Sequence, residues 1–399
     1  MRLPFCILAL AVSGWAASPD TPQPADTPTP DQAQAPAPAT APAPADAAKP
    51  ADATPPAPPP KYDGFVFSAL ADGYQTTNFN HPFGSANTNQ LQNFDLFSGN
   101  PELSLVKVTV DKSDKVVGFH VDAGFGETMR LIHAGDVAAI DHKALRYIEQ
   151  MYVIAKPNHT HGTEFDFGQF VTSAGAEVIE ANANWNYSRS LLFALAIPYY
   201  HFGLRTSTPI TKTWTVGLQV VNAWNTVWGN NDLKNVGITS ALTETKYTWS
   251  VNYYVGPNNP GTTSGQRNLV DSTLLLTPNS KVNYYINVDY AQNNFAGGGS
   301  ANWYGIAGAA TIHLNSKFAI TPRAEVFDDH NGFTTGTKQA IKEGTITGEY
   351  KYNDHFIGRL EYRHDSSNAP FFDRGAQMAV VNGQNTFTVA LMAILGPLK

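Results

Sequence analysis

Charged side chains recur at every second position in three segments near the C-terminal end of the chain. This spacing places them on one face of a β-strand, because successive side chains of a strand point to opposite sides. Each face carries both signs of charge. The charges can pair across neighbouring strands, or they can face water and act on dissolved ions, and the sequence leaves both open. The basic residues are Arg323, Lys351, Arg359 and Arg363, and the acidic ones are Glu325, Glu349 and Glu361.

A second set of charges lies in "TSAGAEVIEANANWNY", residues 172–187. Glu177 and Glu180 of this segment would face the basic residues across an enclosed space, which would create a transverse field for ions. Arg189 follows closely, and its planar guanidinium suits several simultaneous hydrogen bonds. We expect Arg189 to bind Glu177, Glu180 or backbone carbonyls of the segment, with contact to a solute as the alternative.

Residue types for metal binding or catalysis are present without a supporting pattern. His159 and His161 lie close to Glu164, but no third and fourth ligands are specified, so we predict no metal site. The chain has no nucleophile-elbow motif and no Gly-rich phosphate loop. We therefore expect neither an enzyme nor a cofactor.

The elements that position these residues are strands of about 9–12 residues, in which apolar and polar residues alternate. Outside the first residues of the chain, no segment has the run of about 20 apolar residues that a membrane helix needs. The pattern predicts an all-β protein. Clear examples are "TKYTWSVNYYV" at 245–255, "KVNYYINVDY" at 281–290 and "HFIGRLEYRH" at 355–364.

Short and long connections alternate along the chain, as in bacterial outer-membrane barrels. They predict a transmembrane antiparallel β-barrel of about 16 strands, within a range of about 14–18, which is wide enough for an aqueous channel. Weak strand patterns at 95–110 and 147–156 leave this range open. The short turns lie near 111–115, 156–162, 208–213, 241–246, 277–281, 314–317 and 352–354. The long loops lie near 75–93, 126–146, 172–187, 224–234, 257–266, 292–302, 329–340 and 366–386.

A continuous apolar run extends from Leu191 to Tyr200. It is too short for a spanning helix and contains Pro198, so we expect one membrane strand, the sixth. Lipid would cover one face of this strand. The preceding segment, 172–187, would fold inward, cover the other face and narrow the lumen as a constriction loop.

The N-terminal part of the chain differs from the rest. Residues 1–17 have the pattern of a secretory signal peptide and contain Cys6, the only cysteine. Residues 18–60 form a disordered Ala/Pro-rich linker, either a spacer or a tether that contacts peptidoglycan. Residues 61–399 form the barrel. Its near-neutral charge argues against nucleic-acid binding.

Four segments carry a family resemblance. They are "DGYQTTNFN" at 72–80, "GQFVTSAGAEVIEANANWNYSRSLLFALAIPYYHFGLR" at 168–205, "VNAWNTVWGNND" at 221–232 and "GEYKYNDHFIGRLEYRHDSSNAPFF" at 348–372. On these segments the chain resembles the β-barrel porin family 2 of bacterial outer-membrane proteins, from about residue 61 to 399, which implies an outer-membrane barrel with a pore. The terminal "FTVALMAILGPLK" lacks the final Phe or Trp of many such barrels.

These observations favour a porin in the bacterial outer membrane that passes small hydrophilic solutes or ions by passive diffusion. Mixed charges predict weak ion selectivity. The partners would be membrane lipid and the solutes, with a homotrimer as a further hypothesis. The alternatives are a non-conducting barrel whose surface loops bind a ligand or partner, and a secreted soluble β protein.

Overall fold

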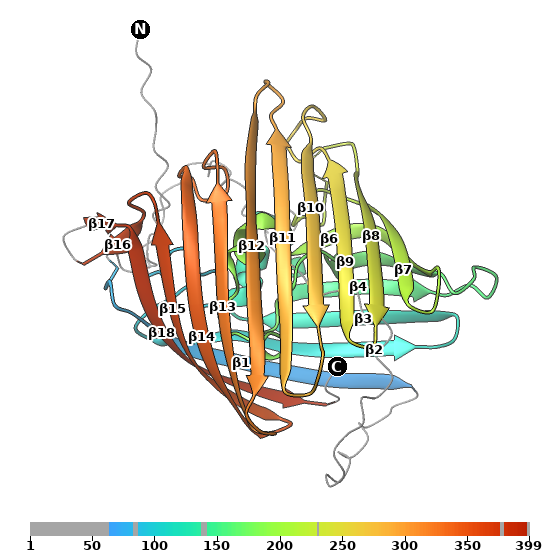
Figure 1. Ribbon diagram of the computed structural model, residues 1–399. Coiled ribbons are helices and arrows are strands. Elements are labelled where there is room, and N and C mark those ends of the chain that lie inside the picture. Colours follow the sequence, from blue (N-terminus) through green and yellow to red (C-terminus); the bar gives the residue numbers. More distant parts are fainter. Residues whose placement is uncertain (1–63, 83–86, 137–141, 230, 376–378, 397–399) are drawn as a thin grey trace, which may run out of the picture.

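Sixteen antiparallel strands close into one barrel in the computed structural model, which describes residues 64–82, 87–136, 142–229, 231–375 and 379–396 (Figure 1). Each strand pairs with its neighbours in the sequence, and β18 closes the ring by pairing with β15 and β1. The predicted fold class and strand number are therefore confirmed. The predicted signal peptide and linker, residues 1–60, lie outside the described residues.

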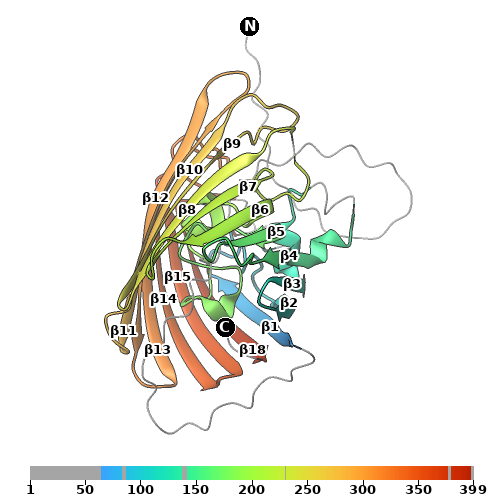
Figure 2. The same ribbon diagram turned by 90° about the vertical axis from the view of Figure 1, so that its right-hand side faces the viewer.

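The first eight barrel strands are β1 (Phe65–Asn78), β2 (Pro101–Ser113), β3 (Val117–Phe125), β4 (Ile148–Ala155), β5 (Glu164–Val171), β6 (Tyr200–Pro209), β7 (Trp214–Val221) and β8 (Asn235–Glu244). The others are β9 (Tyr247–Gly256), β10 (Arg267–Leu276), β11 (Val282–Asn294), β12 (Ser300–His313), β13 (Phe318–Asp329), β14 (Gln339–Asn353), β15 (Phe356–Ser367) and β18 (Gly383–Leu395). Figure 2 shows their tilt around the ring.

Short elements occupy the connections between strands. In the described part of the chain, no helix is long and apolar enough to cross a membrane. The helical elements are α1 (Glu127–Ile132), two 3-10 turns, η1 (Leu145–Tyr147) and η2 (Ala181–Ala183), and a π-helical turn, η3 (Leu192–Ala196). A two-stranded hairpin consists of β16 (Phe372–Arg374) and β17 (Ala379–Val381).

The connections follow the predicted alternation of short turns and longer loops. The stretches with weak strand patterns form β2 and β4. The connection between β5 and β6 is longer than predicted and extends over residues 172–199, whereas the one between β11 and β12 is shorter and has only residues 295–299.

The two faces of the wall differ in polarity, as the alternation predicts. On β15, Leu360 and Tyr362 point outward and are 55% and 42% exposed, whereas Arg359 and Glu361 are 3% and 2% exposed. Arg359 lies opposite Glu349 of β14 in the strand register. An apolar outer face suits lipid, because hydrocarbon cannot solvate charged groups.

The prediction that Leu191–Tyr200 forms the sixth membrane strand is wrong. The sixth strand begins at Tyr200, and the preceding residues lie inside the barrel, where η3 contacts β11 and β12 (Figure 1). Side chains from Leu191 to Ile197 are at most 2% exposed. The run is apolar on every side because protein surrounds it completely, as expected for a buried helical segment.

A charge placed at the middle of the outward face should destabilise the barrel. Leu360 lies near the centre of β15, and Leu360→Arg should lower the free energy of unfolding by about 2–4 kcal/mol, because a guanidinium enters hydrocarbon. Tyr352→Arg, at the end of β14, should cost at most about 1 kcal/mol. Equilibrium unfolding from phospholipid vesicles measures both, and equal losses would contradict a lipid-facing outer surface.

Candidate functional site

Residues 172–199, the connection between β5 and β6, fold into the barrel and are named the inward segment. Side chains outside the segment bind the backbone near both of its ends. Asn252 Nδ2 donates to the carbonyl oxygen of Ser173 at 2.8 Å, and Asn225 Oδ1 accepts from the N–H of Tyr199 at 2.6 Å. Residues 172–187, for which a constriction loop is predicted, thus contact the inner side of the wall, and the connection continues to residue 199. That these residues narrow a channel stays a prediction.

Two glutamates of the wall bind amide groups of the inward segment. Glu361 of β15 accepts from the N–H groups of Tyr187 at 2.6 Å and Ser188 at 2.9 Å. Glu325 of β13 accepts from the N–H of Leu191 at 2.7 Å, where the helical turn begins. These amides lie outside regular secondary structure, and an unpaired buried amide costs about 1–3 kcal/mol. The carboxylates therefore determine where the segment can lie.

Three of the predicted basic residues bind carbonyl groups of the inward segment. Arg323, Arg359 and Arg363 are only 1–3% exposed, so they do not line open water. Their guanidinium groups donate in several directions at once, which a lysine ammonium does less well. The bonds run from Arg323 Nη1 to Ser188 O (2.6 Å), from Arg359 Nη1 to Ala181 O (2.7 Å) and Asn186 O (3.0 Å), and from Arg363 Nη1 to Arg189 O (2.7 Å).

The same arginines also pair with carboxylates of the wall. A buried charge needs such a partner, because removal from water is costly. The rows of opposite charge therefore pair with each other and with the inward segment. The pairs are Arg323 Nε–Glu343 Oε2 (3.3 Å), Arg359 Nη2–Glu349 Oε2 (2.6 Å) and Arg363 Nη2–Asp365 Oδ1 (2.8 Å).

Glu177 is the acidic residue of the inward segment that meets the arginine rows. Its Oε1 lies 2.8 Å from Arg323 Nη1, and its Oε2 accepts from the N–H of Ser190 at 2.6 Å. The carboxylate thus connects the beginning of the segment to its middle and to the wall.

Glu180 points to a different part of the wall and pairs with Lys107 of β2. Lys107 Nζ also lies 3.3 Å from Asp122 and 3.4 Å from Glu149. Oxygen atoms of the three carboxylates lie within 4.8 Å of one another, a spacing that a cation could bridge. The ammonium of Lys107 contacts all three, so the protein supplies the cation itself.

Arg189 donates to three backbone carbonyls of the inward segment. Its Nε donates to Val178 O at 3.3 Å and its Nη1 to Tyr187 O at 2.5 Å, and its Nη2 donates to Ile179 O. The guanidinium also lies 4.6 Å from the ring centre of Phe94. None of its described contacts is with either glutamate of the inward segment.

Lys351 lies apart from the other predicted site residues. Its side chain is 47% exposed, and its Nζ is 3.6 Å from Glu349 Oε1. In the described structure it does not contact the inward segment.

The β1–β2 loop, residues 79–100, also packs against the inward segment, which the sequence did not indicate. Asn93 Nδ2 donates to Ala194 O at 3.1 Å. The ring of Phe94 meets those of Phe193 and Tyr199 edge to face, with centroids 5.3 and 5.4 Å away. Such aromatic pairs contribute about 0.5–1.5 kcal/mol beyond area burial.

Asp95 follows this aromatic contact and is 1% exposed. Neither carboxylate oxygen has a hydrogen-bond partner among the described residues. Burial raises the pKa of Asp95 to about 7, although the positive charge of Arg363 opposes the shift. Glu361 and Asp365 add negative charge nearby and Arg189 positive charge.

The sequence matches the family model described as "Putative beta-barrel porin-2, OmpL-like" over residues 64–395. A search of curated protein sequences gives no match.

Solved structures share the barrel fold at low sequence identity. The outer-membrane expressed OmpT of Vibrio cholerae has a TM-score of 0.54 at 12% identity, covering 84% of this chain and 99% of that one. The outer-membrane channel DcaP of Acinetobacter baumannii has a TM-score of 0.54 at 9% identity, with coverages of 85% and 100%. The anion-selective porin from Comamonas acidovorans has a TM-score of 0.53 at 9% identity, with coverages of 83% and 98%.

Removal of one buried guanidinium should loosen the inward segment. Arg359→Met removes the donor to carbonyls of the segment and leaves Glu349 with only the half-exposed Lys351, so it should lower the free energy of unfolding by about 3–5 kcal/mol. Proteinase K should then cut within residues 181–188, and mass spectrometry maps the cleavage. Lys351→Met removes a half-exposed charge from the neighbouring strand β14 and should lower the free energy of unfolding by at most about 1 kcal/mol, without new cleavage. Identical digestion of the two variants would argue against this attachment.

Packing of the β1–β2 loop should weaken as pH rises. The pKa of Asp95 is near the ordinary aspartate value of 3.8 when the loop is released and about 7 when it is packed, so the packed loop is stabilised most below about pH 4. That stabilisation is lost progressively until about pH 7. Thermolysin should therefore cut residues 87–98 faster at pH 8 than at pH 5, relative to Asp95→Asn measured at each pH. A ratio that does not change with pH would refute the titration of Asp95.

Proposed function

Because the chain belongs to the family of beta-barrel porin-2, OmpL-like proteins, we propose that it forms a water-filled channel for passive diffusion of small hydrophilic solutes or ions. The chain is a porin-like barrel of the bacterial outer membrane. The main support for conduction is a closed ring of sixteen strands whose inward face is polar. Rings of this size leave room for an aqueous channel.

The inward segment would set the width of this channel. Glu177, Arg323, Arg359 and Arg363 would act by fixing the segment to the wall rather than by contacting the solute. Glu180 is only partly buried and would lie at the constriction, paired with Lys107. Arg189 would stabilise the fold of the segment, and Lys351 would have a minor part. Since most of these charges are paired, weak ion selectivity is expected.

The linker would lie in the periplasm. Phe65, the first residue of β1, pairs with Lys112 beside the short turn between β2 and β3. Short turns of outer-membrane barrels lie on the periplasmic side, so the chain before residue 64 would enter from there. A homotrimer and contact of the linker with peptidoglycan stay predictions, as does the absence of catalysis. The non-conducting, ligand-binding barrel remains the alternative, with no observation in its favour.

Planar-bilayer recording tests conduction directly. The wild-type protein should insert with discrete conductance steps. Replacement of residues 179–183 by one glycine should raise the step size, because the inward segment then fills less of the lumen. Val178 and Asn184 can be joined in this way, since Asn184 Nδ2 already donates to Val178 O at 2.7 Å.

Deletion of residues 296–298 provides a matched control. They lie in the exposed connection between β11 and β12, so conductance should not change. A correctly folded wild-type barrel without any conductance would exclude the channel. Equal conductance steps in the wild type and the 179–183 variant would show that the inward segment does not set the width of the channel.

A further inference from the structure

We propose that the lumen contains a binding site for an uncharged polyhydroxylated solute, such as a sugar, against the wall formed by β5–β9. This inference deepens the proposed function by naming a solute class, and it rests on that function for the entry of the solute. The site is a partly open cavity beside the first residues of the inward segment.

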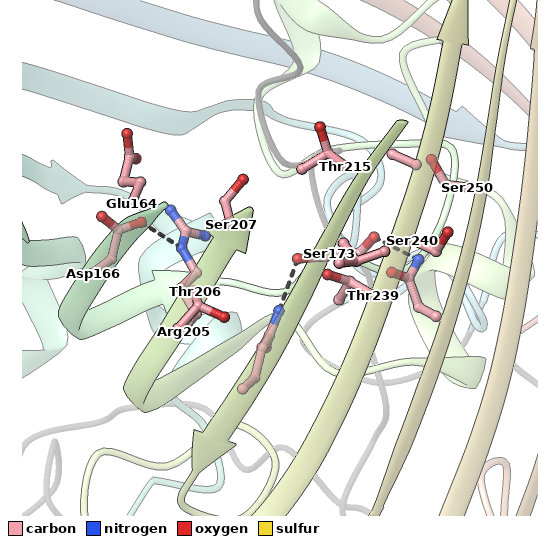
Figure 3. Close-up of a pocket in the computed structure, with 14 residues that line it drawn as sticks. Glu164, Asp166, Ser173, Arg205, Thr206, Ser207, Thr215, Thr239, Ser240 and Ser250 are labelled. Carbon is pink, nitrogen blue, oxygen red and sulfur yellow. Dashed lines mark hydrogen bonds and ion pairs between the residues drawn. The ribbon is translucent and has the colours of Figure 1, made fainter. Parts of the chain in front are cut away.

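Arg205 of β6 lines this cavity, and its guanidinium is a hydrogen-bond donor held in a fixed orientation (Figure 3). Its guanidinium lies 4.5 Å from the ring centre of Phe170 and 5.0 Å from that of Tyr152. Its Nε donates to Asp166 Oδ2 at 2.7 Å. Neither Nη atom donates to a described residue, and the side chain is 18% exposed. The two rings and Asp166 thus fix the orientation of a guanidinium edge that remains available.

Hydroxyl groups of four adjacent strands complete the lining. They come from inward-facing positions that strand register brings together, since Thr215 pairs with Ala241, Thr239 with Asn252, and Ala241 with Ser250. One of these residues is exposed and three are partly exposed, and none of the four hydroxyl groups has a hydrogen-bond partner among the described residues. The hydroxyls belong to Ser207, Thr215, Thr239 and Ser250.

Acceptors without partners lie in the same lining. Asp166 Oδ1 and Gln219 Oε1 are buried and have no hydrogen-bond partner in the described structure. The cavity therefore presents guanidinium donors and hydroxyls that both donate and accept. A sugar hydroxyl also donates and accepts, so a polyhydroxylated solute satisfies both kinds of group at once.

The charge of the cavity favours a neutral solute over an ion. Asp166 pairs with Arg205, and Glu164 pairs at 2.6 Å with Lys156, which lies outside the lining, so each charge of the lining has an ionic partner. An anion would meet the carboxylates of Asp166 and Glu164, whereas a cation would meet Arg205. An apolar solute would leave the hydroxyls and the guanidinium edge unpaired, which is unfavourable.

Saturation-transfer NMR with glucose tests this site in the full-length protein purified in detergent. Glucose should give a saturable signal, and triethylene glycol dimethyl ether, which has no hydroxyl groups, should not. The double variant Thr239→Val with Ser250→Ala should raise the glucose concentration at half-saturation about threefold to tenfold, because two hydrogen bonds to the sugar are lost. Arg205→Lys keeps the positive charge but removes the two Nη donors, so it should also raise the glucose concentration at half-saturation.

Thr311→Val provides the matched control, since this inward threonine of β12 lies outside the cavity and should leave the glucose signal unchanged. A non-saturable glucose signal, equal signals from glucose and the ether, or the same half-saturation in the double variant would overturn the proposal. So would stronger binding of gluconate than of glucose.

Bilayer conductance of the same preparation separates this inference from the proposed function. A protein that conducts but does not bind glucose overturns only the solute site. A protein that binds glucose without conducting keeps the site and overturns the channel.

Discussion

The structure depends on one interaction: buried charged side chains of the barrel wall bind the backbone of a chain segment that has little regular structure. The inward segment has amides and carbonyls that no strand partner satisfies, and buried peptide groups need partners. Glu325 and Glu361 bind the amides, while Arg323, Arg359 and Arg363 bind the carbonyls. Without these bonds, the segment would have no defined place in the lumen.

Apolar packing against β12 also holds the inward segment in place. The inward face of β12 has small residues, Ala301, Gly305 and Ala307, which leave space for η3. A Cβ at Gly305 would lie 2.7 Å from Leu192 Cδ2 and 2.6 Å from the carbonyl oxygen of Val326, so this position has no room for a side chain. Trp303, also on β12, donates from Nε1 to the carbonyl oxygen of Ala196 in η3 at 3.1 Å. The turn is therefore enclosed by apolar contacts while its first amide is bound by a carboxylate.

Much of the barrel could be predicted from the sequence, because a strand repeats every two residues and the repeat is local. Alternation around Arg359 and Leu360 fixes which side chain faces the lumen and which faces lipid. The apolar run from Leu191 was misassigned because a lipid-facing strand and a buried helical segment are both continuously apolar. The small inward residues of β12 were a signal that something apolar packs there. They could have corrected the assignment.

Contacts between distant segments could not be predicted in this way. Lys107 lies in a stretch with a weak strand pattern, and nothing in that stretch predicts its pairing with Glu180. Asp95 appears in the sequence as an ordinary loop residue, and only the packing of Phe94 explains its burial. The hydroxyls beside Arg205 belong to separate strands, and register alone brings them together.

Hydrogen exchange of the wild-type protein in lipid tests the central claim most directly, because it reports on the amides of the inward segment itself. The claim predicts that the amides of Tyr187, Ser188 and Leu191, which donate to Glu361 and Glu325, exchange as slowly as amides of the neighbouring strands β13 and β15. Fast exchange throughout residues 187–191, with slow exchange in those strands, would contradict it.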